Sequence, residues 1–295
     1  SQSNYPSDNI VRVTAGVNNA KTRADGAGTE LKNNFSLTIV NKNTEKPELA
    51  SKYSYTDKVF SKSSGDWACS ETLLWQDSKT PVDIVAFAPA QTGKFSGVCD
   101  NDRNIKPITY SVTDDQSTSS DNNDLLYYYA KDFKPGTSLD ENGKLSIQFN
   151  HAFCMIDINV TLGTEFNKPK VLKESPIVKM TLGGTKIAAN VDVLNAASVV
   201  TASGEAADIT TTKGSFTPAE NADKKADPEK NAISRFSCIA IPQTVAGKTF
   251  KVSLMTADKL YEWTSAEPVE LKSGYRYTLE LSMGNDVVLL KGGSG

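Results

Sequence analysis

An alternation of apolar and polar residues with a period of two recurs along the chain, and this pattern limits the fold more than any other feature. Successive side chains of a β-strand point to opposite faces, so each alternating run predicts a strand with one buried face. Helical periodicity is scarce between these runs. The alternation therefore predicts an all-β protein with little helix. The runs that carry this prediction cover residues 10–17, 35–39, 145–149, 156–162 and 275–283.

One run differs because its apolar side chains occupy consecutive positions. Residues 82–88 (VDIVAFA) are apolar on both faces, and Pro81 and Pro89 flank them. A strand that is apolar on both faces is typical of the centre of a sheet that is covered on both sides. We therefore expect a central strand here.

The alternation slips by one residue near the middle of the chain. Its apolar positions carry odd numbers from Leu145 to Phe153 and even numbers from Ile156 to Leu162. A slip of one residue turns every side chain to the opposite face of a strand. The strand must therefore contain a β-bulge or break between Phe153 and Met155.

Length and turn signals predict two domains. A chain of 295 residues reaches the size, about 250–300 residues, at which single hydrophobic cores stop growing. The strongest turn signals are Pro135-Gly136 and Asn142-Gly143. We therefore place a boundary near residue 140 and expect two β-sandwich domains in series, residues 1–140 and residues 141–295.

Composition argues against several classes of function. Lys and Arg number 32 against 35 Asp and Glu, and they form no basic stripe of the kind that binds nucleic acid. No run approaches the roughly 18 consecutive apolar residues of a membrane span. The glycines of residues 182–186 (LGGTK) lack the spacing of a phosphate-binding loop. We expect no cofactor.

The histidine and the cysteines give no catalytic or metal-binding pattern. His151 is the single histidine, and no recognisable nucleophile motif accompanies it, so its simplest role is to cap backbone groups at the slip. The cysteines form no CxxC pair, which argues against a zinc or redox site. Two disulfides and buried free thiols both fit the sequence. We therefore expect a protein that is not an enzyme and holds no metal. The four cysteines are Cys69, Cys99, Cys154 and Cys238.

Several segments, taken in order, resemble a known family. They are TRAD near the N-terminus, VDIVAFAP, DLLYYYA, LSIQFNHAFCMIDINV and SGYRYTLEL. In this order they resemble the Bacteroidales fimbrillin family, the subunits of type V pili. The resemblance implies two transthyretin-like β-sandwich domains, export to the outer membrane as a lipoprotein, and maturation by an arginine-specific protease. Residues 1–8 would then follow a lipidated cysteine of the exported precursor.

The resemblance also implies that proteolysis removes the first strand. Arg23 lies with Gly26 and Gly28 in a loop between two alternating runs, where a flexible segment can enter a protease. We expect cleavage between Arg23 and Ala24, with Lys21 as a less favoured site, and loss of residues 1–23. The apolar residues of the removable strand are Ile10, Val11, Val13, Ala15 and Val17.

Loss of that strand would have a large energetic effect. About five buried apolar side chains at ~1.5–3 kcal/mol each contribute at most about 8–15 kcal/mol. This range is comparable to the whole stability of a typical domain, about 5–15 kcal/mol. The cut protein would expose an apolar groove flanked by unpaired backbone groups, so we expect it to take up a strand from another subunit.

The segment that would supply the new strand is short. After residues 275–283 the chain offers one apolar run, Val287, Val288, Leu289 and Leu290. Three arrangements remain open. The run forms a hairpin with the preceding strand and the donor is missing, or the run is mobile and is itself donated, or the natural chain continues beyond its Gly-Ser end.

Two functions follow from these observations. The first is a structural subunit of a cell-surface fimbria that supports adhesion and polymerises by donor-strand exchange after cleavage; its partners are other fimbrial subunits and the maturation protease. The alternative is a pilus-tip or surface-anchored β-sandwich adhesin. Its loops, such as residues 113–124 and 201–232, would bind a glycan or a host protein.

Overall fold

The computed structural model describes residues 4–20, 29–118, 121–166, 171–220 and 230–294. Strands dominate this part of the chain, and its α-helices are short, α1 (Pro47–Lys52) and α2 (Pro135–Ser138). Each begins with a proline, whose fixed φ suits the first helical position. The all-β prediction is confirmed. Single turns of 3-10 helix are η1 (Ser96–Val98), η2 (Asp121–Asn123) and η3 (Thr164–Phe166).

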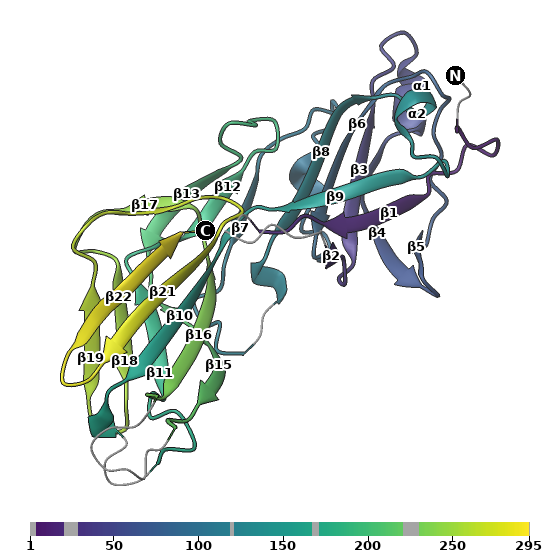
Figure 1. Ribbon diagram of the computed structural model, residues 1–295. Helices are drawn as coiled ribbons and strands as arrows, with labels where there is room; N and C mark the ends of the chain where they lie inside the picture. The colour runs from purple at the N-terminus through teal and green to yellow at the C-terminus, as the bar shows by residue number, and fades with distance from the viewer. Residues whose placement is uncertain (1–3, 21–28, 119–120, 167–170, 221–229, 295) are drawn as a thin grey trace.

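The largest sheet has eight strands in the order β2-β1-β9-β8-β6-β3-β4-β5 (Figure 1). Its neighbouring strands are antiparallel except β1 and β9, which run parallel. The expected central strand is β6, which is buried along its whole length between β8 and β3. The strands are β1 (Val13–Val17), β2 (Thr29–Glu30), β3 (Phe35–Asn41), β4 (Tyr55–Ser63), β5 (Asp66–Cys69), β6 (Val82–Ala88), β8 (Leu126–Phe133) and β9 (Leu145–His151).

The other strands form four smaller sheets, most of which Figure 1 shows at the opposite end of the molecule. The five-stranded sheet contains β15 (Thr212–Thr217), β16 (Ile233–Ala240), β10 (Cys154–Leu162), β21 (Arg276–Met283) and β22 (Val287–Ser294), in that order. The four-stranded sheet contains β14 (Ile209–Thr210), β11 (Lys179–Gly183), β18 (Lys251–Met255) and β19 (Leu260–Thr264). The last two sheets are β13 (Val200–Ala206), β12 (Lys186–Val191) and β7 (Ile108–Ser111), and β17 (Gln243–Val245) with β20 (Val269–Leu271).

Two clusters of buried apolar side chains hold these sheets together. Cluster 1 includes residues of β1, β3, β6 and β9, and its aromatic rings include Phe35 and Phe149, whose centroids lie 5.6 Å apart. Cluster 2 packs against β6 through Phe87, whose ring stacks on Phe95 at 4.8 Å, and it continues among the smaller sheets. Because Ala86 belongs to cluster 1 and Phe87 to cluster 2, the two faces of β6 are covered by different clusters. This arrangement explains why the run is apolar at consecutive positions.

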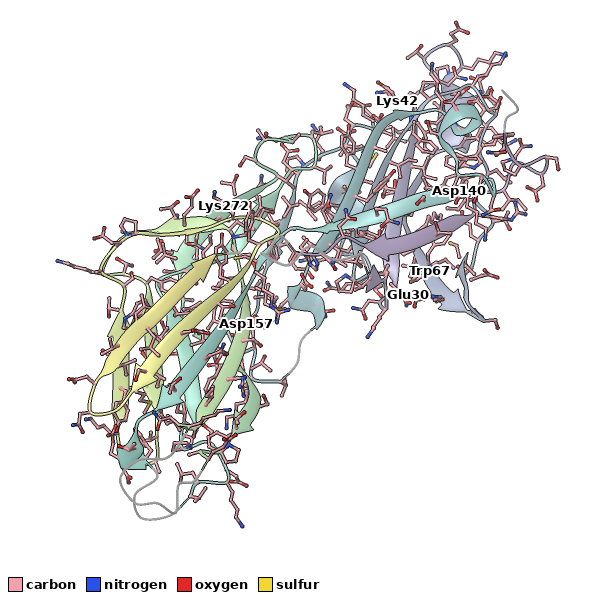
Figure 2. All side chains as sticks on the ribbon, viewed as in Figure 1. Glu30, Lys42, Trp67, Asp140, Asp157 and Lys272 are labelled. Atoms are coloured by element: carbon pink, nitrogen blue, oxygen red, sulfur yellow. The ribbon has the colours of Figure 1, made fainter. Side chains whose placement is uncertain are left out.

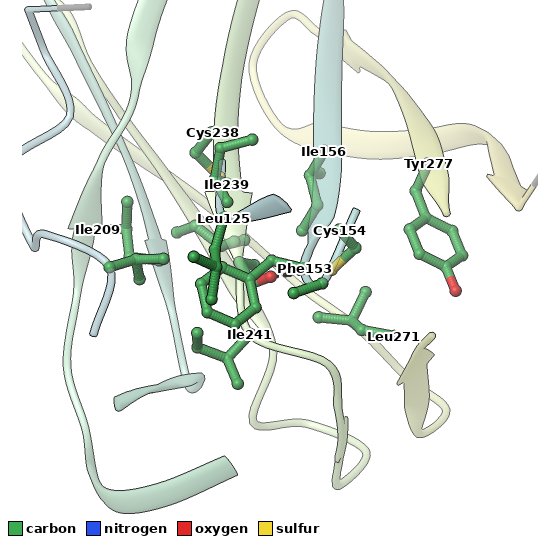
Figure 3. Packing of buried hydrophobic residues seen from close by; sticks show 14 of the residues in the cluster. Leu125, Phe153, Cys154, Ile156, Ile209, Cys238, Ile239, Ile241, Leu271 and Tyr277 are labelled. Carbon is green, nitrogen blue, oxygen red and sulfur yellow. Dashed lines mark hydrogen bonds between the residues drawn. The ribbon is translucent and has the colours of Figure 1, made fainter. Parts of the chain in front are cut away.

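The slip in the alternation marks a break between two sheets. Strand β9 ends at His151 in the eight-stranded sheet, and β10 begins at Cys154 in the five-stranded sheet. Ala152 donates its N–H to the carbonyl of Leu125, and Phe153 lies in cluster 2 (Figure 3). The apolar side chains of β9 belong to cluster 1 and those of β10 to cluster 2. The chain therefore changes both sheet and cluster at the slip.

The expected boundary near residue 140 stays a prediction. Strand β7 precedes that position, yet it pairs with β12 from Ile108↔Val191 to Ser111↔Ala188. Cluster 2 also contains residues from both sides of the position. Hydrogen bonds and buried side chains thus connect the two predicted parts.

The structure corrects the sequence interpretation of two loops. Residues 201–232, expected to be a binding loop, contribute to β13, β14 and β15. Within residues 113–118, Gln116 is only 3% exposed. Its amide accepts a hydrogen bond from the N–H of Ile239 at 2.8 Å and donates one to the carbonyl of the same residue at 2.9 Å. This segment is therefore anchored to β16.

All four cysteines are free thiols, which decides between the two alternatives left open by the sequence. Cys69 and Cys99 are partly exposed, and Cys154 and Cys238 are buried in cluster 2. Burial raises the pKa of Cys238 to about 12 and also raises the pKa of Cys154. A thiol with a raised pKa carries little thiolate at neutral pH, so these two side chains act as small apolar groups.

We expect Gln116→Ala to lower the free energy of unfolding by about 1–3 kcal/mol, because it leaves the buried N–H and carbonyl of Ile239 without partners. Chemical denaturation measures this difference. Gln148→Ala is the control, because Gln148 is exposed and its loss is expected to change stability by about 0.5 kcal/mol or less. Equal effects of the two substitutions would contradict an anchoring role of Gln116.

We also expect two classes of thiol. In the folded protein at pH 8, a thiol reagent should label Cys69 and Cys99, which are partly exposed, and leave Cys154 and Cys238 unmodified, because both of these side chains are buried. All four should react in denaturant without a reductant. Mass spectrometry of the labelled peptides measures both results. Fewer than four reactive thiols in denaturant would reveal a disulfide and contradict the structure.

Candidate site of strand exchange

The N-terminal strand uses its two sides to bind different parts of the protein. The backbone groups of its even-numbered residues face β9, with which the strand pairs in parallel from Val13↔Leu145 to Val17↔Phe149. The backbone groups of its odd-numbered residues face the other way. Just upstream of the strand, the N–H of Val11 donates to the carbonyl of Leu73 at 2.9 Å. The carbonyl of Asn9 accepts from the N–H of Trp75 at 2.8 Å. Residues 10–17 therefore join residues 73–75 to β9, through the bridge of Ile10 with Leu74 and the ladder of β1.

The structure refines the burial expected for this segment. Val11, Val13 and Val17 are buried in cluster 1, whereas Ile10 and Ala15 are only partly buried. Three buried valines contribute roughly 5–9 kcal/mol as an upper bound, at ~1.5–3 kcal/mol each. The segment thus remains a major part of the first cluster, although it buries less than the sequence suggested.

Residues that follow the loop of the expected cleavage site are fixed separately. Strand β2 pairs with β1 only at Gly16↔Glu30 and Val17↔Thr29. Glu30 also forms an ion pair with Lys62 of β4, and Leu31 is buried in cluster 1. The chain is therefore anchored on both sides of the loop by different contacts. Arg23 and Ala24 themselves lie outside the described residues.

The short run near the C-terminus lies in β22, at the edge of the five-stranded sheet. It forms an antiparallel hairpin with β21, with Met283↔Val287 and Leu281↔Leu289 among its pairs. Val287 is partly buried, whereas Val288, Leu289 and Leu290 are 40–58% exposed. The hairpin arrangement is thus the one present in this structure. Exposed apolar side chains on an edge strand are unusual, because such edges promote pairing with other chains.

A cavity of about 370 Å³ lies beside this edge. Leu289 of β22 contributes to its wall together with Phe250, Trp263, Leu271 and Leu279. Strand β22 therefore covers part of an apolar surface of the second cluster, while most of its own apolar area faces solvent.

The structure does not bring the removable strand and the C-terminal run together. Strand β1 belongs to the eight-stranded sheet and β22 to the five-stranded sheet, at opposite ends of the molecule in Figure 1. An exchange between them would therefore have to join two molecules.

Sequence reasoning missed the pairing of the N-terminal segment with residues 73–75. Leu73 and Trp75 are large apolar residues, and the sequence shows no more of them than that. Their bonds to Asn9 and Val11 are formed by backbone atoms. Side-chain patterns carry no signal for such a short bridge.

His151 has a different partner from the one expected. Its Nδ1 lies 3.0 Å from a carboxylate oxygen of Asp124, so the ring pairs with an acidic side chain instead of capping orphan backbone groups. Among the described residues no group of histidine, cysteine and carboxylate side chains could hold a metal ion. No helix in the same ranges is long and apolar enough to cross a membrane.

Comparisons with known proteins agree with this architecture. A candidate cell-adhesion protein from Bacteroides ovatus superposes with a TM-score of 0.64 at 14% identity, covering 97% of each chain. A candidate cell-adhesion protein from Bacteroides uniformis gives 0.60 at 12% identity over 98% of each chain. A fimbrial protein from Bacteroides vulgatus gives 0.55 at 12% identity, covering 97% of this chain and 98% of its own. At such identities these similarities establish the fold alone.

The sequence itself also matches a known family. A search of curated protein sequences finds no match. The sequence profile described as fimbrillin-like matches residues 22–294, which is nearly the whole chain. Fimbrillins are structural proteins and not enzymes, in agreement with the expectation from the sequence. The chain therefore belongs to the fimbrillin-like family.

Proposed function

We propose that this protein is a structural subunit of a type V pilus and that it polymerises by donor-strand exchange. Proteolysis after Arg23 releases residues 1–23, including β1, and a strand from another subunit takes the place of β1 beside β9. Membership of the fimbrillin-like family supports a fimbrial role.

The observation that carries the proposal is the position of β1. This strand buries three valines in cluster 1 and makes its main ladder with one neighbour, β9. Its release would leave an apolar groove along an unpaired edge of β9. A second extended strand can restore both kinds of contact, because main-chain hydrogen bonds and alternating side-chain pockets are common to all such strands.

Strand β22 is the donor in this proposal. Val288 and Leu290 are both exposed in the hairpin, where the register shifts at Leu290. As alternate residues they would share one face once the segment is paired as a regular strand. In the groove left by β1 the same side chains would be buried against cluster 1. Exchange therefore converts exposed apolar area on one subunit into buried area on the next.

The proposal includes a location and further partners that the family resemblance implies. The subunit would be exported to the outer membrane as a lipoprotein, cut by an arginine-specific protease, and incorporated into a cell-surface fimbria with other subunits, where it supports adhesion. Polymerisation at the cell surface would then begin only after cleavage.

Digestion with an arginine-specific protease tests the cleavage step. We expect one early cut, a product that begins at Ala24, and SDS-resistant oligomers, because the open groove is filled by another subunit. Mass spectrometry and electrophoresis measure these results. Arg23→Lys should remain uncut and monomeric, whereas the control Arg103→Lys should behave as the wild type. A chain that is cut after Arg23 and then only unfolds would contradict the proposal.

The double substitution Val288→Asp and Leu290→Asp tests the donor. Both side chains are exposed in the uncut protein, so the melting temperature should change little. After cleavage the variant should stay monomeric, because two carboxylates cannot be buried in an apolar groove without a large cost. Size-exclusion chromatography measures assembly. The matched control replaces Val178 and Leu194 with Asp. Both lie outside β22 and are about as exposed as Val288 and Leu290. Normal assembly of the β22 variant would exclude this donor.

A further inference from the structure

A second cavity lies where β9 leaves the eight-stranded sheet. Its volume is about 580 Å³, and its walls come from β8, β9, the β12–β13 connection, β17 and the β20–β21 loop. Figure 2 shows Lys272 on the β20–β21 loop, at the end of the smaller sheets nearest to β9. The lining residues that matter for its chemistry are Tyr127, Asn150, His151, Gln243, Glu270 and Lys272.

Several polar groups of this wall have hydrogen-bonding capacity to spare. Among the described residues, no hydrogen bond or ion pair engages the hydroxyl of Tyr127 or the carboxylate of Glu270. The side-chain oxygen of Asn150 accepts from Asn18 at 2.8 Å, which leaves the amide nitrogen of Asn150 as a donor. Lys272 adds three N–H donors on an exposed side chain.

The Asp124 contact fixes the orientation of His151. Because Nδ1 lies 3.0 Å from the carboxylate of Asp124, Nε2 is the remaining ring atom that can bind a ligand. His151 lines this cavity and a smaller one of about 190 Å³. The imidazole therefore lies between the two cavities, and its hydrogen bond with Asp124 fixes its orientation.

The pattern of these groups selects a class of ligand. Donors and acceptors stand around one cavity, and the half-buried ring of Tyr127 adds an apolar face. The charges of Glu270 and Lys272 are opposite, so the wall favours neither an anion nor a cation. An apolar ligand would require a mainly apolar wall. A neutral molecule with several hydroxyl groups and one apolar face matches all of these features.

We propose that the cavity binds a neutral saccharide of one or two rings. Its volume lies within the usual range for small-ligand sites, about 300–1,000 Å³. Glu270 accepts hydrogen bonds from ring hydroxyls, Asn150 and Lys272 donate to them, and the ring of Tyr127 packs against the apolar face of the sugar. The uncut monomer contains this site, whose wall includes Asn19 of the segment that cleavage would release, so binding is measured on the uncut chain.

The single histidine provides a direct measurement. The Cε1 proton of His151 gives one imidazole signal of its kind in the NMR spectrum of the uncut chain. The probes are methyl glycosides of glucose, galactose, mannose and N-acetylglucosamine, together with lactose, and N-acetylneuraminic acid serves as the charged comparison. We expect at least one neutral probe to shift this signal in a saturable way, with a dissociation constant of about 1 mM, as for a few hydrogen bonds at an exposed site.

Paired variants locate the binding site. Glu270→Gln and Tyr127→Phe should each weaken binding about 2- to 10-fold, because each alters one hydrogen-bonding group. Glu267→Gln and Tyr128→Phe are the matched controls, because neither residue lines this cavity, and they should leave binding unchanged. Thermal melts confirm that all four variants are folded.

Three results would overturn the proposal. The first is the absence of a shift with every neutral probe at tens of millimolar. The second is binding that the site variants and the control variants weaken equally, which would place the sugar elsewhere. The third is tighter binding of N-acetylneuraminic acid than of any neutral probe, which would contradict the assigned class. None of them bears on cleavage or polymerisation.

Discussion

The parallel pairing of β1 with β9 is the constraint on which the rest of the structure depends. Strand β9 has β8 on one side, so its other side must find a partner for its backbone groups. The same partner must cover cluster 1 with apolar side chains at alternate positions. Val11, Val13 and Val17 meet this second requirement, and the backbone of even-numbered residues such as Arg12 and Asn18 meets the first. Any extended strand with apolar side chains at alternate positions meets both requirements, so a strand from another chain could satisfy them.

The break after β9 links this edge to the other sheets. The chain pairs with β1 up to Phe149 and with β8 up to His151, and it pairs with β16 from Cys154 and with β21 from Met155. Only two residues separate the last pair with β8 from the first pair with β16. The eight-stranded and five-stranded sheets are therefore joined by one short, buried connection, with Phe153 in cluster 2. The saccharide cavity lies beside this connection, where two sheets end and side chains from several strands converge.

Sequence patterns predicted the strands that bury one face. They did not predict the strands whose apolar and polar residues do not alternate. Strands β9 and β10 and the central strand β6 were evident from their apolar positions. Strands β13 and β15 were missed because their residues are small, polar and mostly exposed. The contact of His151 with Asp124 joins residues 27 positions apart, and the bridge to residues 73–75 is made by the backbone. Neither contact leaves a periodic trace in the sequence.

Cleavage also changes the effective concentration of β1 beside β9, and this effect is separate from the geometry of the strands. Before the cut, β1 is tethered to β2, and a short tether gives a strand an effective concentration in the millimolar range. A free donor at micromolar concentration is about 1,000-fold less concentrated, a disadvantage of about 4 kcal/mol. Two strands of similar intrinsic affinity would therefore leave the tethered one in place. Cutting the tether removes this advantage without altering a single contact of the groove. In the proposed mechanism the protease thus controls assembly through chain connectivity, and the contacts of β1 need only match those of the donor.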